Sequence, residues 1–131
     1  MSRRFLPLLF AVALQAHAFD PAKDVAMTVA QGRLTVAIPP GAHLTCRSFK
    51  VALASGAGHL EVGPMPAAQG RDAVGDPIWR GTVQVPLRGE GLGERVVLRI
   101  TFQPCTEGPD AVCFLPQQRI LILDAAASGL R

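Results

Sequence analysis

Two cysteines, Cys105 and Cys113, are the residues of this sequence whose spacing most directly suggests chemistry. They lie in the segment TFQPCTEGPDAVCFLPQ, which is rich in proline, glycine and acidic residues. Strand-like runs end just before Cys105 and begin just after Cys113, so two antiparallel strands would bring their Cα atoms within the roughly 4.4–6.8 Å that a disulfide requires. The pair can be a structural disulfide, a metal clip or a redox pair. Spacing alone favours the structural disulfide.

The first 18 residues have the features of an export signal. Arg3 and Arg4 precede an apolar run over residues 5–14, and residues 16–18 read Ala-His-Ala, with small residues at the two positions that a signal peptidase inspects. The run is shorter than the roughly 20 apolar residues of a spanning helix. We therefore expect cleavage after Ala18 and a periplasmic mature chain of residues 19–131, in a compartment where disulfides persist.

The charge balance of the mature chain argues against polyanionic partners. The full sequence has 13 basic and 10 acidic residues, and loss of Arg3 and Arg4 leaves 11 basic residues against the same 10. This near-neutral surface predicts no nucleic-acid or anionic-membrane partner. No later segment is apolar enough to span a membrane, and we expect a monomer. The three cysteines leave at least one thiol free, intermolecular or bound to a ligand.

Short apolar alternations separated by turn residues predict an all-β fold. The expected strands cover residues 25–30, 33–38, 46–53, 59–62, 78–87, 95–103 and 118–124. Gln31-Gly32 is expected to form a tight hairpin turn, residues 65–77 a long loop and residues 125–131 a frayed tail. About seven short strands in a chain of this size indicate one immunoglobulin-like antiparallel β-sandwich with its core in residues 25–124.

The cysteine segment resembles the signature of the amino-terminal periplasmic domain of the thiol:disulfide interchange protein DsbD. The stretch VVLRITFQPC…VCFLPQQRILIL has the family's strand, its aromatic-Gln-x-Cys, its acidic loop and its Cys-aromatic-x-Pro, where Phe114 is the aromatic. The segments PPGAHLTCRSFKV and DPIWRGTVQVPL resemble two further family motifs. The likeness extends over nearly the whole predicted mature chain.

The resemblance implies an immunoglobulin-like domain that works as a thiol-disulfide oxidoreductase without a cofactor. Cys105 and Cys113 match the family's redox pair, and Cys113 matches the cysteine that attacks the partner. The resemblance further implies that a membrane electron donor supplies reducing equivalents, which then pass to periplasmic thioredoxin-fold proteins. Because the family's membrane part and carboxy-terminal thioredoxin-like domain have no counterpart in this sequence, we expect these partners to act in trans.

The sequence departs from the family pattern around the expected site. Two extra residues separate the cysteines, and the family's two aromatics beside the site fall on His43 and Thr45. The aromatic cap that covers the cysteines falls near Ala73 and Val74, and Asp72 matches an acid beside that cap. A small cap would shield the sulfurs less and could change the choice of partner.

Cys46 has no counterpart in the family pattern. It can be a buried small apolar residue, or a thiol that attacks the Cys105–Cys113 bond in an isomerisation. It can also join His43, Cys105 and Cys113 in a Cys₃His set suited to Zn²⁺ or Cu⁺, although no metal-binding spacing supports that set, and we predict no metal. His43 is expected to be a turn residue or, if it lies near Cys113, a group that stabilises the thiolate. The alternatives to thiol exchange are thus an interaction module with a structural disulfide and a Cys/His metal-binding domain.

Overall fold

The computed structural model describes residues 18–131. The predicted export signal lies, except for Ala18, outside the described residues. The strands are β1 (Ala26–Ala30), β2 (Arg33–Ala37), β3 (Ala42–Thr45), β4 (Lys50–Ser55), β5 (His59–Val62), β6 (Gly70–Arg71), β7 (Pro77–Trp79), β8 (Thr82–Glu90), β9 (Arg95–Phe102), β10 (Pro104–Thr106) and β11 (Gln117–Asp124), with a single-turn 3₁₀ helix, η1 (Cys46–Ser48). Among residues 18–131, no helix has the length and apolar character needed to cross a membrane.

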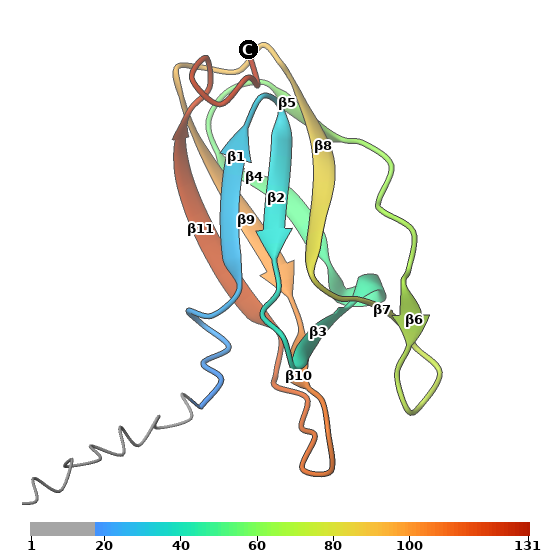
Figure 1. Cartoon of the computed structure of the whole chain (residues 1–131). Coiled ribbons are helices and arrows are strands. Elements are labelled where there is room, and N and C mark those ends of the chain that lie inside the picture. The colour runs from blue at the N-terminus through green and yellow to red at the C-terminus, as the bar shows by residue number, and fades with distance from the viewer. Residues whose placement is uncertain (1–17) are drawn as a thin grey trace, which may run out of the picture.

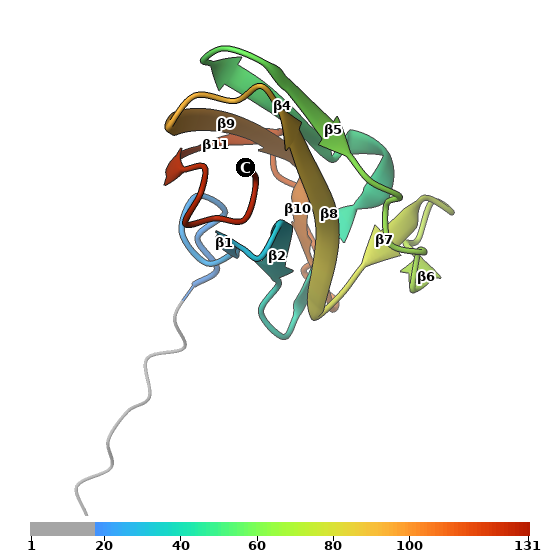
Figure 2. The same ribbon diagram turned by 90° about the horizontal axis from the view of Figure 1, so that it is seen from above.

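The strands form three antiparallel sheets. Two of them, β1-β2-β8-β5 and β11-β9-β4, enclose the core between them, as the view from above shows (Figure 2). The third, β10-β3-β7-β6, lies at one end of the sandwich, away from the carboxyl terminus (Figure 1). The predicted all-β, immunoglobulin-like sandwich is confirmed.

Alternation of buried apolar residues with more exposed ones in β8 and β9 builds the centre of the core. Successive side chains of a strand point to opposite faces, so every second residue faces inward. In β8 the inward residues are Val83, Val85 and Leu87, and in β9 they are Val96, Leu98, Ile100 and Phe102, all of them buried. The predicted Gln31-Gly32 turn is also confirmed, since both residues have positive φ (52° and 70°), as a tight hairpin turn of this kind requires.

The small end sheet was not predicted. The expected strand over residues 78–87 is interrupted at Gly81, whose φ of 65° lets the chain leave β7 in the end sheet and enter β8 in the main sheet. The expected loop over residues 65–77 contains the two-residue strand β6, which pairs with β7. Both differences arise because the chain changes sheets, and a period-two pattern in the sequence does not record which sheet a strand joins.

The expected strand over residues 46–53 is displaced towards its carboxyl end. Cys46 begins η1, where the Phe49 amide donates a hydrogen bond to the Cys46 carbonyl (3.2 Å), and the strand itself starts at Lys50. Phe49 packs edge-on against Trp79, with ring centroids 5.1 Å apart. This buried corner joins β3 of the end sheet to β4 of a main sheet.

The prediction of a frayed tail over residues 125–131 is wrong. Ala125, Ser128 and Leu130 are buried, and the Gly32 amide donates a hydrogen bond to the Ser128 carbonyl (2.9 Å). Gly129 has a φ of 72°, and a Cβ there would lie 2.6 Å from the Gly32 nitrogen. The tail therefore packs over the β1–β2 turn and closes the end of the sandwich opposite the end sheet.

We expect Leu130→Ala to lower the free energy of unfolding by about 2–4 kcal/mol, because Leu130 is only 3% exposed and its loss leaves a cavity. Urea unfolding followed by tryptophan fluorescence measures the change. Arg131→Ala, at an exposed position, is the matched control. A Leu130→Ala variant as stable as this control would contradict the packed tail.

Candidate functional site

Cys105 and Cys113 form a disulfide at the β10 edge of the end sheet. The two Cα atoms are 4.0 Å apart, and the residues face each other across an antiparallel bridge between β10 and the returning chain. The hairpin that carries them is closed independently by backbone hydrogen bonds from Thr106 to Val112 (2.8 Å) and from Phe114 to Pro104 (3.0 Å). Backbone pairing and the covalent bond thus hold the same loop.

The two cysteines differ in exposure. Cys105 lies within β10 and is 1% exposed, whereas Cys113 lies in the returning segment and is exposed. A molecule approaching from solvent therefore reaches the Cys113 side of the disulfide first.

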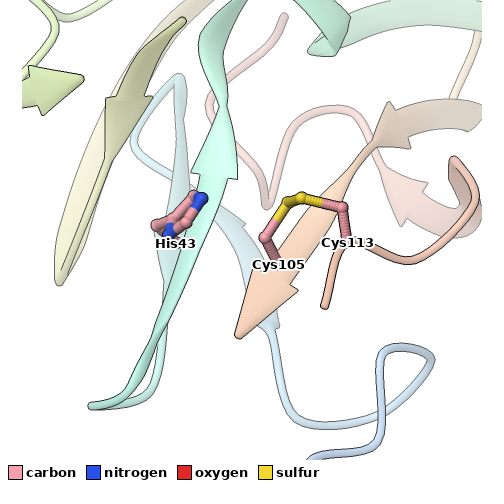
Figure 3. A group of neighbouring side chains, drawn as sticks. All are labelled: His43, Cys105 and Cys113. Atoms are coloured by element: carbon pink, nitrogen blue, oxygen red, sulfur yellow. A yellow bond between two sulfur atoms is a disulfide. The ribbon is translucent and has the colours of Figure 1, made fainter. Parts of the chain in front are cut away.

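His43 lies beside the disulfide on the neighbouring strand. β3 and β10 pair in antiparallel register with His43 opposite Cys105, so both side chains project from the same face of the end sheet. A ring nitrogen of His43 and the two sulfurs all lie within 4.8 Å of one another. Figure 3 shows the edge of the imidazole turned towards the sulfur–sulfur bond.

A carboxylate and a guanidinium fix the orientation of His43. Its Nδ1 lies 3.2 Å from the Glu107 Oε1, and the Arg80 Nε bonds to the same oxygen. The hydrogen bond from Arg80, supplemented by the one from His43, holds the pKa of Glu107 below its usual range. Because an ionised carboxylate can only accept hydrogen bonds, the proton of this contact is on Nδ1. Arg80, Glu107 and His43 thus form a connected chain that ends at the disulfide.

A short loop between β6 and β7 faces the disulfide across a cleft of about 460 Å³. The cleft is lined by His43, Arg71, Asp72, Ala73, Val74, Arg80, Thr106, Glu107, Gly108, Ala111, Val112 and Cys113. The Asp72 Oδ1 accepts hydrogen bonds from the amides of Val74 (3.0 Å) and Asp76 (2.9 Å), which shapes the loop. Ala73 and Val74, where the family resemblance predicts the cap, and Asp72 beside them therefore lie in the loop that faces Cys113 across the cleft.

Three other predicted residues lie outside this cleft. The hydroxyl of Thr45 donates to the Gln103 carbonyl (3.2 Å), which makes it part of the corner that Ser48 and Gln103 also form. Phe114 turns away and packs against Phe19, with ring centroids 5.7 Å apart. Cys46 is half-buried against the core, and burial raises the pKa of its thiol.

The hypothetical four-residue metal set is not assembled. Among residues 18–131, the compact group with metal-ligating atoms contains His43, Cys105 and Cys113 but not Cys46. The two sulfurs of this group are bonded to each other. In the disulfide state, the imidazole is the only one of these three side chains with a nitrogen or thiolate free to bind a ligand. The position of Cys46 agrees with its interpretation as a small apolar residue.

Sequence reasoning missed Arg80 and Glu107. Glu107 lies two residues after Cys105 in a loop rich in acidic residues and glycine, and Arg80 is the arginine that follows Trp79 in DPIWRGTVQVPL. The only sequence signal for either was its position inside a segment that resembles the family. Their contact depends on the end sheet, which the periodicity did not predict.

No protein-family model matches the sequence, and neither does any curated protein. The fold is similar to that of a solved structure, the DsbD amino-terminal domain of Neisseria meningitidis in its reduced form, with a TM-score of 0.59. The two chains share 18% sequence identity, and the match covers 81% of this chain and 89% of that one. The resemblance expected from the cysteine segment is thus confirmed at the level of the fold.

We expect Glu107→Gln to lower the melting temperature by roughly 1–5 °C at pH 7 and by less at pH 3. The pKa of Glu107 is lowered in the folded state. Its stabilising effect is therefore present above the unfolded glutamate pKa of about 4.3 and is lost as the pH falls through the lower folded value. Thermal unfolding of the oxidised protein measures the change, with the exposed Glu61→Gln as control. A difference that is equal at both pH values would contradict the ion pair.

Proposed function

We propose that this protein exchanges disulfides with thioredoxin-fold proteins through the Cys105–Cys113 pair. The observation that carries the proposal is a disulfide with one exposed cysteine at the mouth of a cleft. A purely structural disulfide needs no open approach, whereas exchange requires a thiolate to reach one sulfur along the axis of the bond. The fold shared with the DsbD amino-terminal domain supports the same role.

The unequal burial of the two cysteines suggests separate roles. Exposed Cys113 is the sulfur that forms the mixed disulfide with a partner, and buried Cys105 is the one that resolves it. In the reduced protein, the Cys113 thiolate attacks a partner disulfide. The Cys105 thiolate then attacks Cys113, releases the partner as a dithiol and restores the intramolecular bond.

The rim of the site supports a protein partner. Val74, Val112 and Leu115 are 82%, 53% and 82% exposed, unusually high for large apolar side chains. Val74 and Val112 line the cleft from opposite sides, and Leu115 follows Cys113 by two residues. Exposed apolar side chains clustered at a cleft are typical of protein-binding surfaces. Val74 and Val112 line the same cleft as Cys113, which a thioredoxin-fold active site must reach.

The cellular setting of the proposal follows from the sequence. The export signal predicted over residues 1–18 supports a periplasmic setting for the exchange, in which a membrane electron donor would reduce the pair and thioredoxin-fold proteins would receive the electrons. The proposal requires no cofactor, because sulfur carries both electrons. The small side chain of Ala73 in the facing loop leaves Cys113 less shielded than an aromatic cap would.

A structural disulfide in an interaction module is the competing function. Two observations favour exchange over it. The cysteine hairpin has its own backbone hydrogen bonds, and a disulfide that closes so short a loop adds comparatively little stability in the chain-entropy model. The domain also has an extensive cluster of buried apolar residues that contains neither cysteine.

The reduction potential of the purified pair separates these functions. We expect a value above about −300 mV, in the range of roughly −270 to −120 mV covered by thioredoxin-fold oxidoreductases. Equilibration in dithiothreitol or glutathione buffers, followed by alkylation and peptide mass spectrometry, measures it without interference from Cys46. A potential below about −300 mV would identify a structural disulfide and refute the exchange function.

A further inference from the structure

The second ring nitrogen of His43 is buried without a hydrogen-bond partner. The residue is 7% exposed, and across residues 18–131 its Nε2 is the one buried side-chain nitrogen or oxygen that lacks such a partner. Buried polar atoms are nearly always bonded, so each exception calls for a physical explanation. A nitrogen that has no hydrogen-bond partner in one state of a protein can have one in another state.

The neighbouring groups determine whether Nε2 carries a proton or a free lone pair. Nδ1 is committed to Glu107, which Arg80 holds as a carboxylate, so the proton of a neutral imidazole lies on Nδ1. Nε2 then presents a lone pair that can accept a proton. The same arrangement of carboxylate, imidazole and nucleophile activates nucleophiles in hydrolases, where the carboxylate fixes the tautomer and stabilises the imidazolium.

The ring that carries the free nitrogen lies beside the disulfide. A ring nitrogen of His43 lies within 4.8 Å of both sulfurs, and the strand register places the ring opposite Cys105. A disulfide has no proton to donate, so Nε2 stays without a partner in the oxidised state. Reduction converts the sulfurs into thiols, which are hydrogen-bond donors and can pass a proton to the imidazole.

The other charged groups that line the cleft are engaged elsewhere. Arg71 donates to the Gly75 carbonyl (2.7 Å), and Asp72 accepts from the amides of its own loop. Arg80 and Glu107 bond to each other. Of these groups, His43 is the one with a buried nitrogen that lacks a hydrogen-bond partner, and its ring lies beside the sulfurs.

We propose that His43 accepts and returns the protons of thiol–disulfide exchange at this site, with Glu107 and Arg80 as positioning residues. This inference rests on the proposed function and assigns its proton transfers. The Cys113 thiol gives its proton to Nε2, and the thiolate attacks a partner disulfide. The partner's sulfur–sulfur bond breaks, and its departing sulfur takes the proton back from the imidazolium.

The second half of the cycle uses the same nitrogen. The Cys105 thiol passes its proton to Nε2 and attacks Cys113, so that the Cys105–Cys113 bond forms. The mixed disulfide breaks and the partner's second sulfur leaves with that proton. In total, two electrons and two protons pass from the protein dithiol to the partner disulfide, and the reverse sequence reduces this protein.

The test compares His43→Gln with His59→Gln, which changes an exposed histidine on β5. The reduced proteins are alkylated with iodoacetamide between pH 5.5 and 9, and peptide mass spectrometry reads Cys113 separately from Cys46. We expect His43→Gln to slow alkylation of Cys113 about tenfold at pH 7, because thiolates are favoured beside an imidazolium. The variant should also lose one inflection of the pH–rate profile, while His59→Gln matches the unaltered protein.

Glu107→Gln provides a second variant that keeps the imidazole. It should slow alkylation of Cys113 less than His43→Gln does, about threefold, because a neutral amide stabilises the imidazolium less than a carboxylate does. Circular dichroism of the reduced proteins checks that both variants fold. If His43→Gln does not fold, the Glu107→Gln profile decides the question.

Unchanged alkylation of Cys113 in folded His43→Gln and Glu107→Gln would overturn this inference and leave the exchange function intact. A potential below about −300 mV together with His43-dependent alkylation would refute the exchange function and retain proton transfer between His43 and the thiols. The two failures are thus distinguishable, because alkylation compares the variants without a partner protein, whereas the potential is measured on the unaltered protein.

Discussion

The antiparallel pairing of β3 with β10 is the constraint on which the site depends. Its register sets His43 opposite Cys105 and directs both side chains to the same face of the end sheet. The adjoining pair in that ladder, Leu44 with Pro104, is fully buried on the core side. Since a shift of one residue would exchange the two faces, burial of Leu44 also fixes the position of His43. The same strand register therefore determines both how Leu44 packs in the core and where His43 lies in the site.

The end sheet separates the two demands that thiol exchange makes on a protein. One sulfur must be reachable, and the other must be held where it can complete the reaction. The hairpin from β10 meets both demands, because Cys105 lies within a paired strand while Cys113 lies on the open return. His43, buried beside them, has a proton-accepting nitrogen in a region of low water access, where charge–charge interactions are stronger than in solvent.

The sequence was informative wherever a local pattern determines structure. Alternation predicted strands over residues 78–87 and 95–103, which overlap the inner strands β8 and β9, and Gln31-Gly32 predicted its turn. The cysteine segment predicted the fold family, although the sequence as a whole matched no family model. Local patterns could not predict the change of sheet at Gly81, the packed tail around Leu130 or the Arg80–Glu107–His43 chain. Each of these depends on contacts between residues far apart in the sequence. Such contacts produce no periodic pattern of apolar residues.

The central claim is that exposed Cys113, and not Cys105 or Cys46, forms the covalent link with partners. Its most direct test uses a thioredoxin with a single active-site cysteine, carried as a disulfide with thionitrobenzoate. Cys105→Ser in its reduced form should release thionitrobenzoate stoichiometrically and form a covalent complex through Cys113. Cys113→Ser should react far more slowly, because Cys105 is 1% exposed. Equal reaction of both variants, or a complex that peptide mapping assigns to Cys46, would contradict the account.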